Sequence, residues 1–506
     1  MISRIHSVAA TTLSPELVEV EAEIIRGMPK FFVVGLGDTA VQEARERVRG
    51  AMKNSGASFP VHHVIVNLAP ADIRKSGPSF DLPIALSILL ASGQVTTSRL
   101  EKTIVIGELA LDGRLRHVNG ILPITAFARE KGFERLILPA CDVMEASLIP
   151  GIEVLGAETL AEVRDYLNGD EEIEPAAPLD ISSLEHEEHH ECDMSVIRGQ
   201  EQAKRALEIA AAGGHNLLMN GPPGSGKTLL ARTFRTILPR LTLEESLEVT
   251  KIYSLAGLLP REQPLVVERP FRTVHHSASG VSIVGGGKVP KPGEITLSHK
   301  GVLFMDEFPE FPRQVLETIR QPLEDGEITV TRIGGTVTYP ARFTLVAAMN
   351  PCPCGFATDP DRECTCPPMA VEKYAKKVSG PILDRIDMFI EVPPVKVEKL
   401  QDSGAGESSA SVRERVQAAR DIQNRRFAGT GISCNKEIPQ KRIVDFCLLD
   451  SPAEQLLKQA VLGMNLSGRA YFRIIRLART IADLARVEII GMPHVAEALQ
   501  YRKKEA

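Results

Sequence analysis

One eight-residue stretch in the middle of the chain has the residue types and spacing of a loop that binds nucleotide phosphates. An apolar run over residues 215–220 precedes it and a segment of helical composition, residues 229–232, follows it, as in a strand, loop and helix. Its glycines allow backbone N–H groups to converge on phosphate oxygens. Lys227 is predicted to reach the β- and γ-phosphates of ATP, and Thr228 to ligate Mg²⁺. The predicted ATP-binding residues are Gly221, Pro222, Pro223, Gly224, Ser225, Gly226, Lys227 and Thr228.

Two further apolar runs end in polar residues that could complete such a site. Residues 301–305 lead to Asp306 and Glu307, and residues 343–349 lead to Asn350. Because a parallel strand ends at the carboxyl edge of its sheet, Asp306 is predicted to bind Mg²⁺ and Glu307 to orient or deprotonate the attacking water. The amide of Asn350 could hold the same water or the γ-phosphate. Taken alone, Asn350 is better explained as a strand-capping residue.

Four of the eight cysteines fall within fifteen positions directly after Asn350. Thiolates suit Zn²⁺ in tetrahedral geometry, so the cluster predicts a structural zinc site that folds a loop. The C-x-C spacing is less diagnostic than C-x-x-C, and reduced thiols in a loop remain the alternative. The four residues are Cys352, Cys354, Cys364 and Cys366.

The bulk composition is that of a cytoplasmic globular protein of about three domains. The chain has 506 residues, of which 43% are apolar and 25% charged, and no apolar run is long enough for a membrane span. The formal charge of −6 is misleading, because residues 169–193 hold ten acidic residues and no Lys or Arg. The remainder has 59 basic and 55 acidic residues. A mildly basic surface permits nucleic-acid binding without requiring it.

The pattern of elements predicts an α/β protein with three domains and a linker. An α+β domain is expected over residues 1–167, with strands at 17–25, 31–34 and 63–67 and helices at 42–54 and 82–92. Residues 168–193 are predicted to form a solvated acidic linker, although three of its histidines, with Cys192, could also bind a metal. These histidines are His186, His189 and His190. A parallel-sheet core is expected over 194–395 and a helical lid over 396–506.

Several motifs together resemble those of the magnesium-chelatase-like AAA+ ATPases, and most closely the ComM/YifB group, over essentially the whole chain. The resemblance implies that Asn350 is the first sensor, Arg385 the arginine finger offered to a neighbouring subunit, and Arg469 the second sensor. A finger supplied in trans requires a ring, which we expect to be a hexamer. A surface ion pair is the alternative for Arg385, and a solvent-exposed helix position for Arg469. The motifs are residues 199–203, 306–307, 350, 379–387 and 467–471.

Two glycine-containing segments are expected to project toward the pore of such a ring. Residues 269–279, followed by 285–288, look like the helix-two insertion of this ATPase group, and residues 326–342 predict a β-hairpin that turns at Gly334-Gly335. Their basic residues could contact DNA phosphates without reading the sequence. Solvated loop charges are the alternative reading. The candidates are Lys288, Lys291 and Arg332.

The N-terminal domain looks like the proteolytic domain of Lon, through residues 75–81 and 107–113. In that family the serine matching Ser79 is the nucleophile and needs a lysine as its base. Here the lysine position falls on Leu122. The domain is therefore expected to be proteolytically inactive and to serve assembly or DNA contact.

The resemblance implies a hexameric, ATP-driven motor on single-stranded or branched DNA. It would be a helicase that promotes branch migration during recombination or natural transformation. A chelatase-type motor for metal insertion into a tetrapyrrole, an ATP-dependent protease and an ATP-regulated assembly scaffold are the alternatives.

Overall fold

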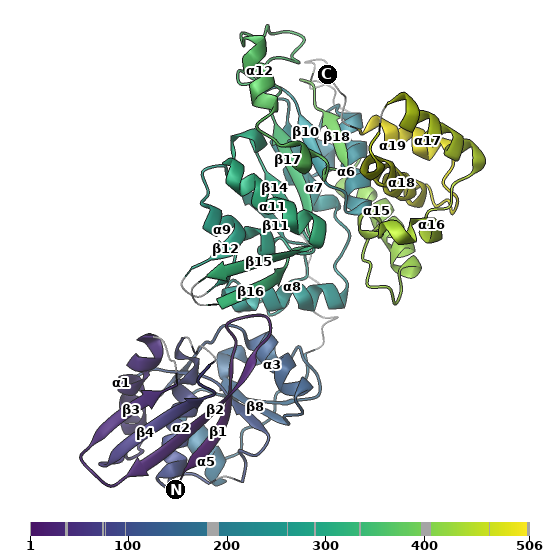
Figure 1. The fold of residues 1–506 in the computed structure, drawn as a ribbon. Helices are drawn as coiled ribbons and strands as arrows, with labels where there is room; N and C mark the ends of the chain where they lie inside the picture. The colour runs from purple at the N-terminus through teal and green to yellow at the C-terminus, as the bar shows by residue number, and fades with distance from the viewer. Residues whose placement is uncertain are drawn as a thin grey trace.

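The computed structural model describes residues 2–502 apart from 36–38, 73–74, 76, 97, 180–191, 261, 288–289, 333–334, 396–405 and 465. The described chain forms an N-terminal α/β domain, a second domain on a parallel sheet, and a group of helices beside that second sheet (Figure 1). The predicted fold class, an α/β protein with a parallel-sheet core and a helical C-terminal part, is confirmed. Among the described residues, no helix has both the length and the apolar character needed to cross a bilayer.

The N-terminal domain is built on one seven-stranded sheet with parallel and antiparallel pairs. Val18, Val20 and Ala22 alternate along β2 as its buried face, as the apolar/acidic alternation predicts. The predicted strands and helices of this domain are present. The sheet order is β3 (Lys30–Val34), β4 (His63–Ala69), β2 (Glu16–Ile25), β1 (Ser3–Ala9), β5 (Thr103–Val105), β8 (Arg135–Pro139) and β9 (Glu153–Ala157). The helices are α1 (Thr39–Asn54), α2 (Asp81–Ala91), α3 (Ile121–Glu130), α4 (Val143–Ala146) and α5 (Leu160–Asn168), and β6 (Glu108–Leu109) pairs with β7 (Leu115–Arg116).

The first part of the predicted linker lies on the N-terminal domain. The backbone N–H of Ala176 donates to the carbonyl of Val154 in β9, at 2.9 Å. Ile173, Ala176 and Leu179 are apolar at intervals of three and pack against the domain's hydrophobic clusters. The three apolar side chains are partly buried, and the other residues from 171 to 178 are exposed, so the segment is solvated except at these three contacts. The linker's three histidines lie outside the described residues.

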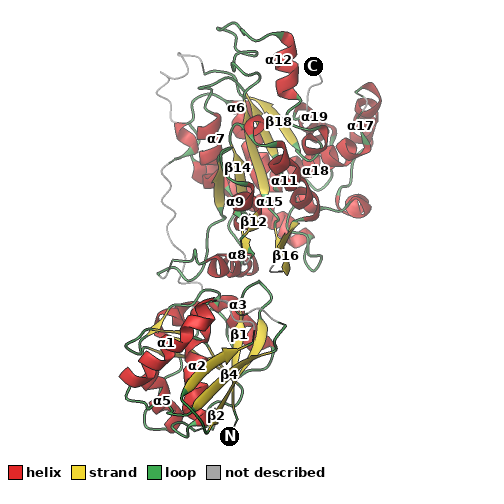
Figure 2. Cartoon of the chain, turned by 60° about the vertical axis from the view of Figure 1, so that its left-hand side comes forward, coloured by secondary structure: helices red, strands yellow, loops and turns green. Residues whose placement is uncertain are grey.

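The second domain has a five-stranded parallel sheet with helices on both faces (Figure 2). Alternate residues of its strands enter different cores; in β10, for example, Leu217 and Met219 face one core and Leu218 the other. The order is β11 (Phe271–Val274), β14 (Val302–Met305), β17 (Thr344–Met349), β10 (Leu217–Asn220) and β18 (Met388–Glu391). Its helices are α6 (Glu201–Gly213), α7 (Lys227–Phe234), α8 (Leu243–Ala256), α9 (Gly280–Val284), α10 (Glu294–Leu297), α11 (Arg313–Asp325), α12 (Pro368–Ala375) and α13 (Gly380–Leu383).

Two β-hairpins extend from this domain and contact each other through β12 and β15. They are β12 (Gly285–Gly286) with β13 (Lys291–Pro292), and β15 (Glu327–Arg332) with β16 (Gly335–Pro340). The hairpin predicted over 326–342 is confirmed. The prediction that residues 269–279 are all insertion is wrong, because Phe271–Val274 is β11, which pairs in parallel with β14 in the core sheet.

The C-terminal helices share one hydrophobic core with a face of the parallel sheet. Leu477 and Ile481 of α18 belong to the same cluster as Leu217 of β10 and Ala206 of α6. Because this core is continuous, movement of the helices against the sheet would expose apolar surface. The helices are α15 (Ser409–Arg426), α16 (Ile443–Phe446), α17 (Ser451–Gly463), α18 (Gly468–Leu484) and α19 (Met492–Gln500).

The N-terminal domain contacts the second domain where α3 meets α8. Leu122 of α3 is fully buried in a cluster with Leu265 of the second domain. Ser254 Oγ of α8 donates to the carboxylate of Glu145, and burial raises the pKa of Glu145. This contact joins the two domains through an apolar cluster and a buried hydrogen bond.

Candidate functional site

The loop between β10 and α7 is folded around the ammonium group of Lys227. Lys227 Nζ donates to the carbonyl oxygens of Gly221 (2.6 Å) and Pro222 (2.8 Å), and burial lowers the pKa of Lys227. Gly226 has φ +90°, and a Cβ on Gly221 would lie 2.2 Å from the carbonyl oxygen of Val392, so both positions require glycine. The loop therefore combines a lysine with the N-terminus of α7, an arrangement suited to binding a phosphate chain.

Asp306 and Glu307 follow β14 at the same edge of the sheet. Thr228 Oγ1 donates to Asp306 Oδ2 at 2.9 Å, so two oxygen ligands of the kind that Mg²⁺ prefers lie together. Glu307 has φ +52°, which is uncommon for a residue with a side chain. Its half-exposed carboxylate lies 2.9 Å from Nδ1 of His276. Strained backbone of this kind is concentrated at functional positions.

Asn350 completes this group at the end of β17, the strand beside β10. Its Oδ1 lies 3.3 Å from Lys227 Nζ. Because β10, β14 and β17 are neighbouring parallel strands, their final residues meet at the carboxyl edge of the sheet. The structure thus brings together Lys227, Thr228, Asp306 and Asn350.

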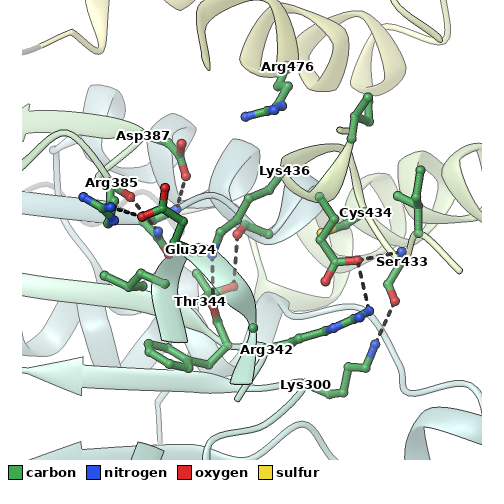
Figure 3. Close-up of a pocket in the computed structure, with 18 of the residues that line it drawn as sticks. Lys300, Glu324, Arg342, Thr344, Arg385, Asp387, Ser433, Cys434, Lys436 and Arg476 are labelled. Carbon is green, nitrogen blue, oxygen red and sulfur yellow. Dashed lines mark hydrogen bonds and ion pairs between the residues drawn. The ribbon is translucent and has the colours of Figure 1, made fainter. Parts of the chain in front are cut away.

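Arg385 and Arg469 lie elsewhere, at a cavity of about 620 Å³ between the sheet and the C-terminal helices (Figure 3). Both approach Glu324 at the end of α11: Arg469 Nη2 is 3.4 Å from Oε1, and Arg385 is paired with Oε2. The cavity is also lined by Asn216 and Thr344, which stand where β10 and β17 begin. The two arginines are therefore at the opposite edge of the sheet from the phosphate-loop residues.

The four clustered cysteines come together beside the phosphate loop. Their sulfur atoms lie within 4.8 Å of one another, and Cys352 Sγ is 3.3 Å from Cys354 Sγ and 3.6 Å from Cys364 Sγ. Tetrahedral Zn²⁺ with bonds of about 2.3 Å needs sulfur separations of about 3.8 Å, so the cluster fits this ion. A hydrogen bond from the Phe356 N–H is the main cause that lowers the pKa of Cys354 to about 6. Cys354 thus offers the thiolate that a metal ligand requires, whereas burial and the neighbouring thiols raise the pKa of Cys364 to about 12, so Cys364 would release its proton on binding a metal.

Comparison with known proteins assigns the whole chain to one family. Three family models match: "Magnesium chelatase, subunit ChlI" over residues 193–400, "Subunit ChlI of Mg-chelatase" over 20–142, and "Magnesium chelatase, subunit ChlI C-terminal" over 406–502. The chain is 44% identical to "Competence protein ComM" of Haemophilus influenzae, over 98% of this chain and 97% of that protein. It is 43% identical to "Uncharacterized protein YifB" of Escherichia coli, over 99% and 97%. The chain belongs to the ComM/YifB family of magnesium-chelatase-like AAA+ ATPases. A more distant relative, the "Magnesium-chelatase 38 kDa subunit" of Cereibacter sphaeroides, is 24% identical over 60% of this chain and 87% of that protein.

ComM/YifB membership implies that the bound ligands are ATP and Mg²⁺, and the carboxyl edge of the sheet offers the groups for both.

Of the three candidate DNA contacts, Lys291 is exposed in β13. Arg332 ends β15, where it pairs with Gly335, but its side chain is outside the described part of the structure. Lys288 also falls outside the described residues.

Three polar residues of this ComM/YifB protein contact predicted site residues at one or other edge of the sheet, but they were not predicted from the sequence. His276 contacts Glu307, Glu324 contacts both arginines, and Asn216 donates to the carbonyl of Arg385. His276 carried only a weak signal, because it lies two positions after β11, a strand that contains Arg272 and Thr273 and is not an apolar run like those before Asp306 and Asn350. The other two carry no such signal, since they act through partners distant in sequence.

Ser79, the residue of the N-terminal domain that matches the Lon nucleophile, is not hydrogen-bonded to a base among the described residues. Its hydroxyl makes no hydrogen bond within the described chain, and Leu122, at the expected lysine position, is fully buried against Leu265. A leucine there buries apolar surface at the domain contact and cannot act as a base.

Proposed function

We propose that this protein hydrolyses ATP at the interfaces of a hexameric ring. Lys227, Thr228 and Asp306 bind Mg-ATP, Glu307 activates water, and Asn350 holds the water or the γ-phosphate. The observation that carries the proposal is the separation of Arg385 from its own phosphate loop by the length of the sheet. An arginine at that edge can neutralise transition-state charge only for ATP bound by the next subunit. Arg469 shares Glu324 with Arg385, and in this proposal it acts across the same interface.

The ring acts on DNA in the cytoplasm, as a helicase that promotes branch migration. The support is the relationship, over 98% of this chain and 97% of the relative, to a protein named for competence. The two contacting hairpins give each subunit a projecting element, with the exposed Lys291 on one of them. Lysines on such loops bind phosphates without reading bases.

The proposal predicts that DNA stimulates ATP hydrolysis. Forked or single-stranded DNA is expected to raise the turnover several-fold at low salt, with the stimulation falling as salt is raised, because phosphate contacts release counterions. Phosphate release measured with and without a four-way junction tests this, and Lys227→Ala is the inactive control. Turnover that is unchanged by every DNA tested would exclude the DNA motor.

A chelatase-type motor is the second candidate, because all three family models describe a magnesium-chelatase subunit. Such a motor would couple ATP hydrolysis to metal insertion into a tetrapyrrole and would not respond to DNA. The same assay therefore separates the two candidates.

We infer that the four cysteines hold a structural Zn²⁺. A Cβ on Gly355, within the cysteine loop, would lie 2.5 Å from Pro223 of the phosphate loop, so the two loops are packed tightly together. A folded cysteine loop thus supports the edge of the ATP site.

The zinc proposal predicts one Zn²⁺ per chain. Cys364→Ser is expected to weaken zinc binding by at least about tenfold, because it removes one of four thiolate ligands. Metal content measured after dialysis against a chelator tests this. Cys141→Ser is the matched control, since Cys141 is an exposed single cysteine in the N-terminal domain. Equal zinc content in the wild type and both variants would contradict the proposal.

The N-terminal domain is proposed to be a Lon-like scaffold without protease activity. Its Leu122, buried at the contact with the second domain, supports a role in joining and orienting domains, and no hydrogen bond joins Ser79 to a base among the described residues. Cleavage of casein that is lost in Ser79→Ala would overturn this part of the proposal.

A further inference from the structure

The side chain of Asn216 occupies a junction of three parts of the molecule. It is 1% exposed and lies directly before β10, whose other end leads into the phosphate loop. Its Oδ1 accepts hydrogen bonds from the backbone N–H of Leu345 in β17 (2.9 Å) and from Lys436 Nζ of the C-terminal region (2.7 Å). Its Nδ2 donates to the carbonyl of Arg385 (2.8 Å). One amide therefore joins the sheet, the helical region and the loop that carries Arg385.

The backbone of Asn216 strengthens the connection to that loop. Its N–H donates to Asp387 Oδ2 at 2.8 Å, and its carbonyl accepts from the N–H groups of Asp387 (3.0 Å) and Met388 (2.9 Å). With the side-chain bond to Arg385, four hydrogen bonds fix residues 385–388 to this one position. The loop is therefore held against the start of β10.

The C-terminal helices hold the same loop from the other side. Arg473 Nη1 of α18 donates to the carbonyls of Asp384 (3.4 Å) and Ile386, which flank Arg385. Lys436, which contacts Asn216, also donates to the carbonyl of Phe343 at 3.0 Å. Figure 3 shows Arg385, Asp387 and Lys436 around the cavity. The guanidinium of Arg385 is thus carried by a loop whose backbone is fixed from two sides.

We propose that Asn216 is a positioning residue for Arg385. Because Asn216 lies at the start of β10 and the phosphate loop at its end, the phosphate loop and Arg385 of one subunit then move as a single rigid unit. The inference rests on the proposed function, in which Arg385 acts on the next subunit. A strand of four residues is short and extended, so its two ends move together. Displacement of the phosphate loop at one end therefore moves Asn216 and the loop that carries Arg385 at the other. Loss of the Asn216 donor should then damage the neighbour's site and leave the subunit's own site intact.

The test uses Asn216→Asp, a change of nearly constant size. Aspartate keeps the acceptor for Leu345 and Lys436, loses the donor to the Arg385 carbonyl and adds a buried negative charge, which the control variant below also adds. A displacement of about 1 Å can cost about 10²-fold in rate, so the variant ring is expected to lose at least about tenfold in turnover. Gln423→Glu is the matched control: Gln423 is a fully buried amide that joins the helical region to α6 through the carbonyl of Ala212, and it does not contact the Arg385 loop.

Mixed rings decide which site is damaged. Asn216→Asp subunits mixed equally with Lys227→Ala subunits are expected to recover activity in about a quarter of the sites, where an intact phosphate loop meets an intact arginine. Mixed with Arg385→Ala subunits, they should recover nothing. The opposite pattern would show that Asn216 serves its own phosphate loop and would overturn the proposal, as would Gln423→Glu giving the same pattern as Asn216→Asp.

The mixture of Lys227→Ala with Arg385→Ala subunits tests whether Arg385 acts on the neighbouring subunit, independently of Asn216. Recovery in this mixture supports an arginine acting in trans and leaves Asn216 to be judged by its own mixtures. Absence of recovery overturns the interfacial site itself, whatever the Asn216 variants do. Size-exclusion chromatography with ATP checks that each variant assembles, and Asn216→Ser, which retains a hydroxyl donor, is expected to recover part of the lost turnover.

Discussion

Replacing Arg385 by alanine is expected to reduce the ATPase turnover of the ring by about 10³-fold or more. The guanidinium offers planar, permanently charged donors to the γ-phosphate as charge develops, and alanine leaves that charge without a partner. ATP binding should be nearly unchanged, because the phosphate loop lies at the other edge of the sheet. Steady-state phosphate release and binding of a fluorescent ATP analogue measure the two effects separately.

The control for this prediction is Arg320→Ala on α11. Arg320 is a half-exposed arginine 4.0 Å from Glu317, and its charge acts on Arg385. An exposed pair of this type contributes little, so its loss should change turnover by no more than about twofold. If Arg385→Ala behaves like Arg320→Ala, the arginine is a surface ion-pair residue and each site is complete within one subunit.

The carboxyl edge of the sheet could be predicted because its chemistry is local in sequence. Asp306 and Asn350 each directly follow a short apolar run. Lys227 lies in a glycine-containing loop that follows a third apolar run. A buried parallel strand fixes where its next residue lies, so three separate segments give one site without knowledge of tertiary contacts. Their proximity, with 3.3 Å between Lys227 Nζ and Asn350 Oδ1, agrees with this expectation.

The opposite edge could not be predicted in the same way. Arg385 lies 61 positions from Glu324 and 169 from Asn216, and no periodicity connects them. Hydrogen bonds between such distant residues depend on strand order, which short motifs do not specify. Resemblance to a family identified Arg385 and Arg469, but it gave neither their shared contact with Glu324 nor the amide that holds the loop.

The contact between the first part of the linker and the N-terminal domain was not predicted, for a related reason. The acidic character of a segment is judged from all of its residues together. Its packing against a domain depends only on its few apolar residues. Ile173, Ala176 and Leu179 are enough to hold this segment on the N-terminal domain despite the acidic residues around them. Edge strand β9 supplies a carbonyl that Ala176 satisfies. Composition predicted the exposure of most of this segment but not the contacts made by its three apolar residues.

Replacing Glu307 by glutamine is expected to lower turnover by about 10²-fold to 10³-fold while ATP remains bound, because general-base catalysis contributes about 10² to 10⁴. Glutamine keeps the size of the side chain and an oxygen for the contact with His276, but it cannot accept a proton from water. Lys227→Ala should instead weaken ATP binding itself, because the lysine supplies the charge that faces the phosphates. Single-turnover hydrolysis with bound ATP measures the loss for Glu307→Gln directly.

Glu310→Gln is the matched control, three residues further along the chain. Glu310 pairs with Lys377 at 2.8 Å on the surface and does not contact His276 or Asp306, so the same chemical change there should leave turnover within about twofold. Near-normal turnover in Glu307→Gln would mean that this carboxylate does not activate water. Hydrolysis would then need another base, and the role assigned to Glu307 would have to be abandoned.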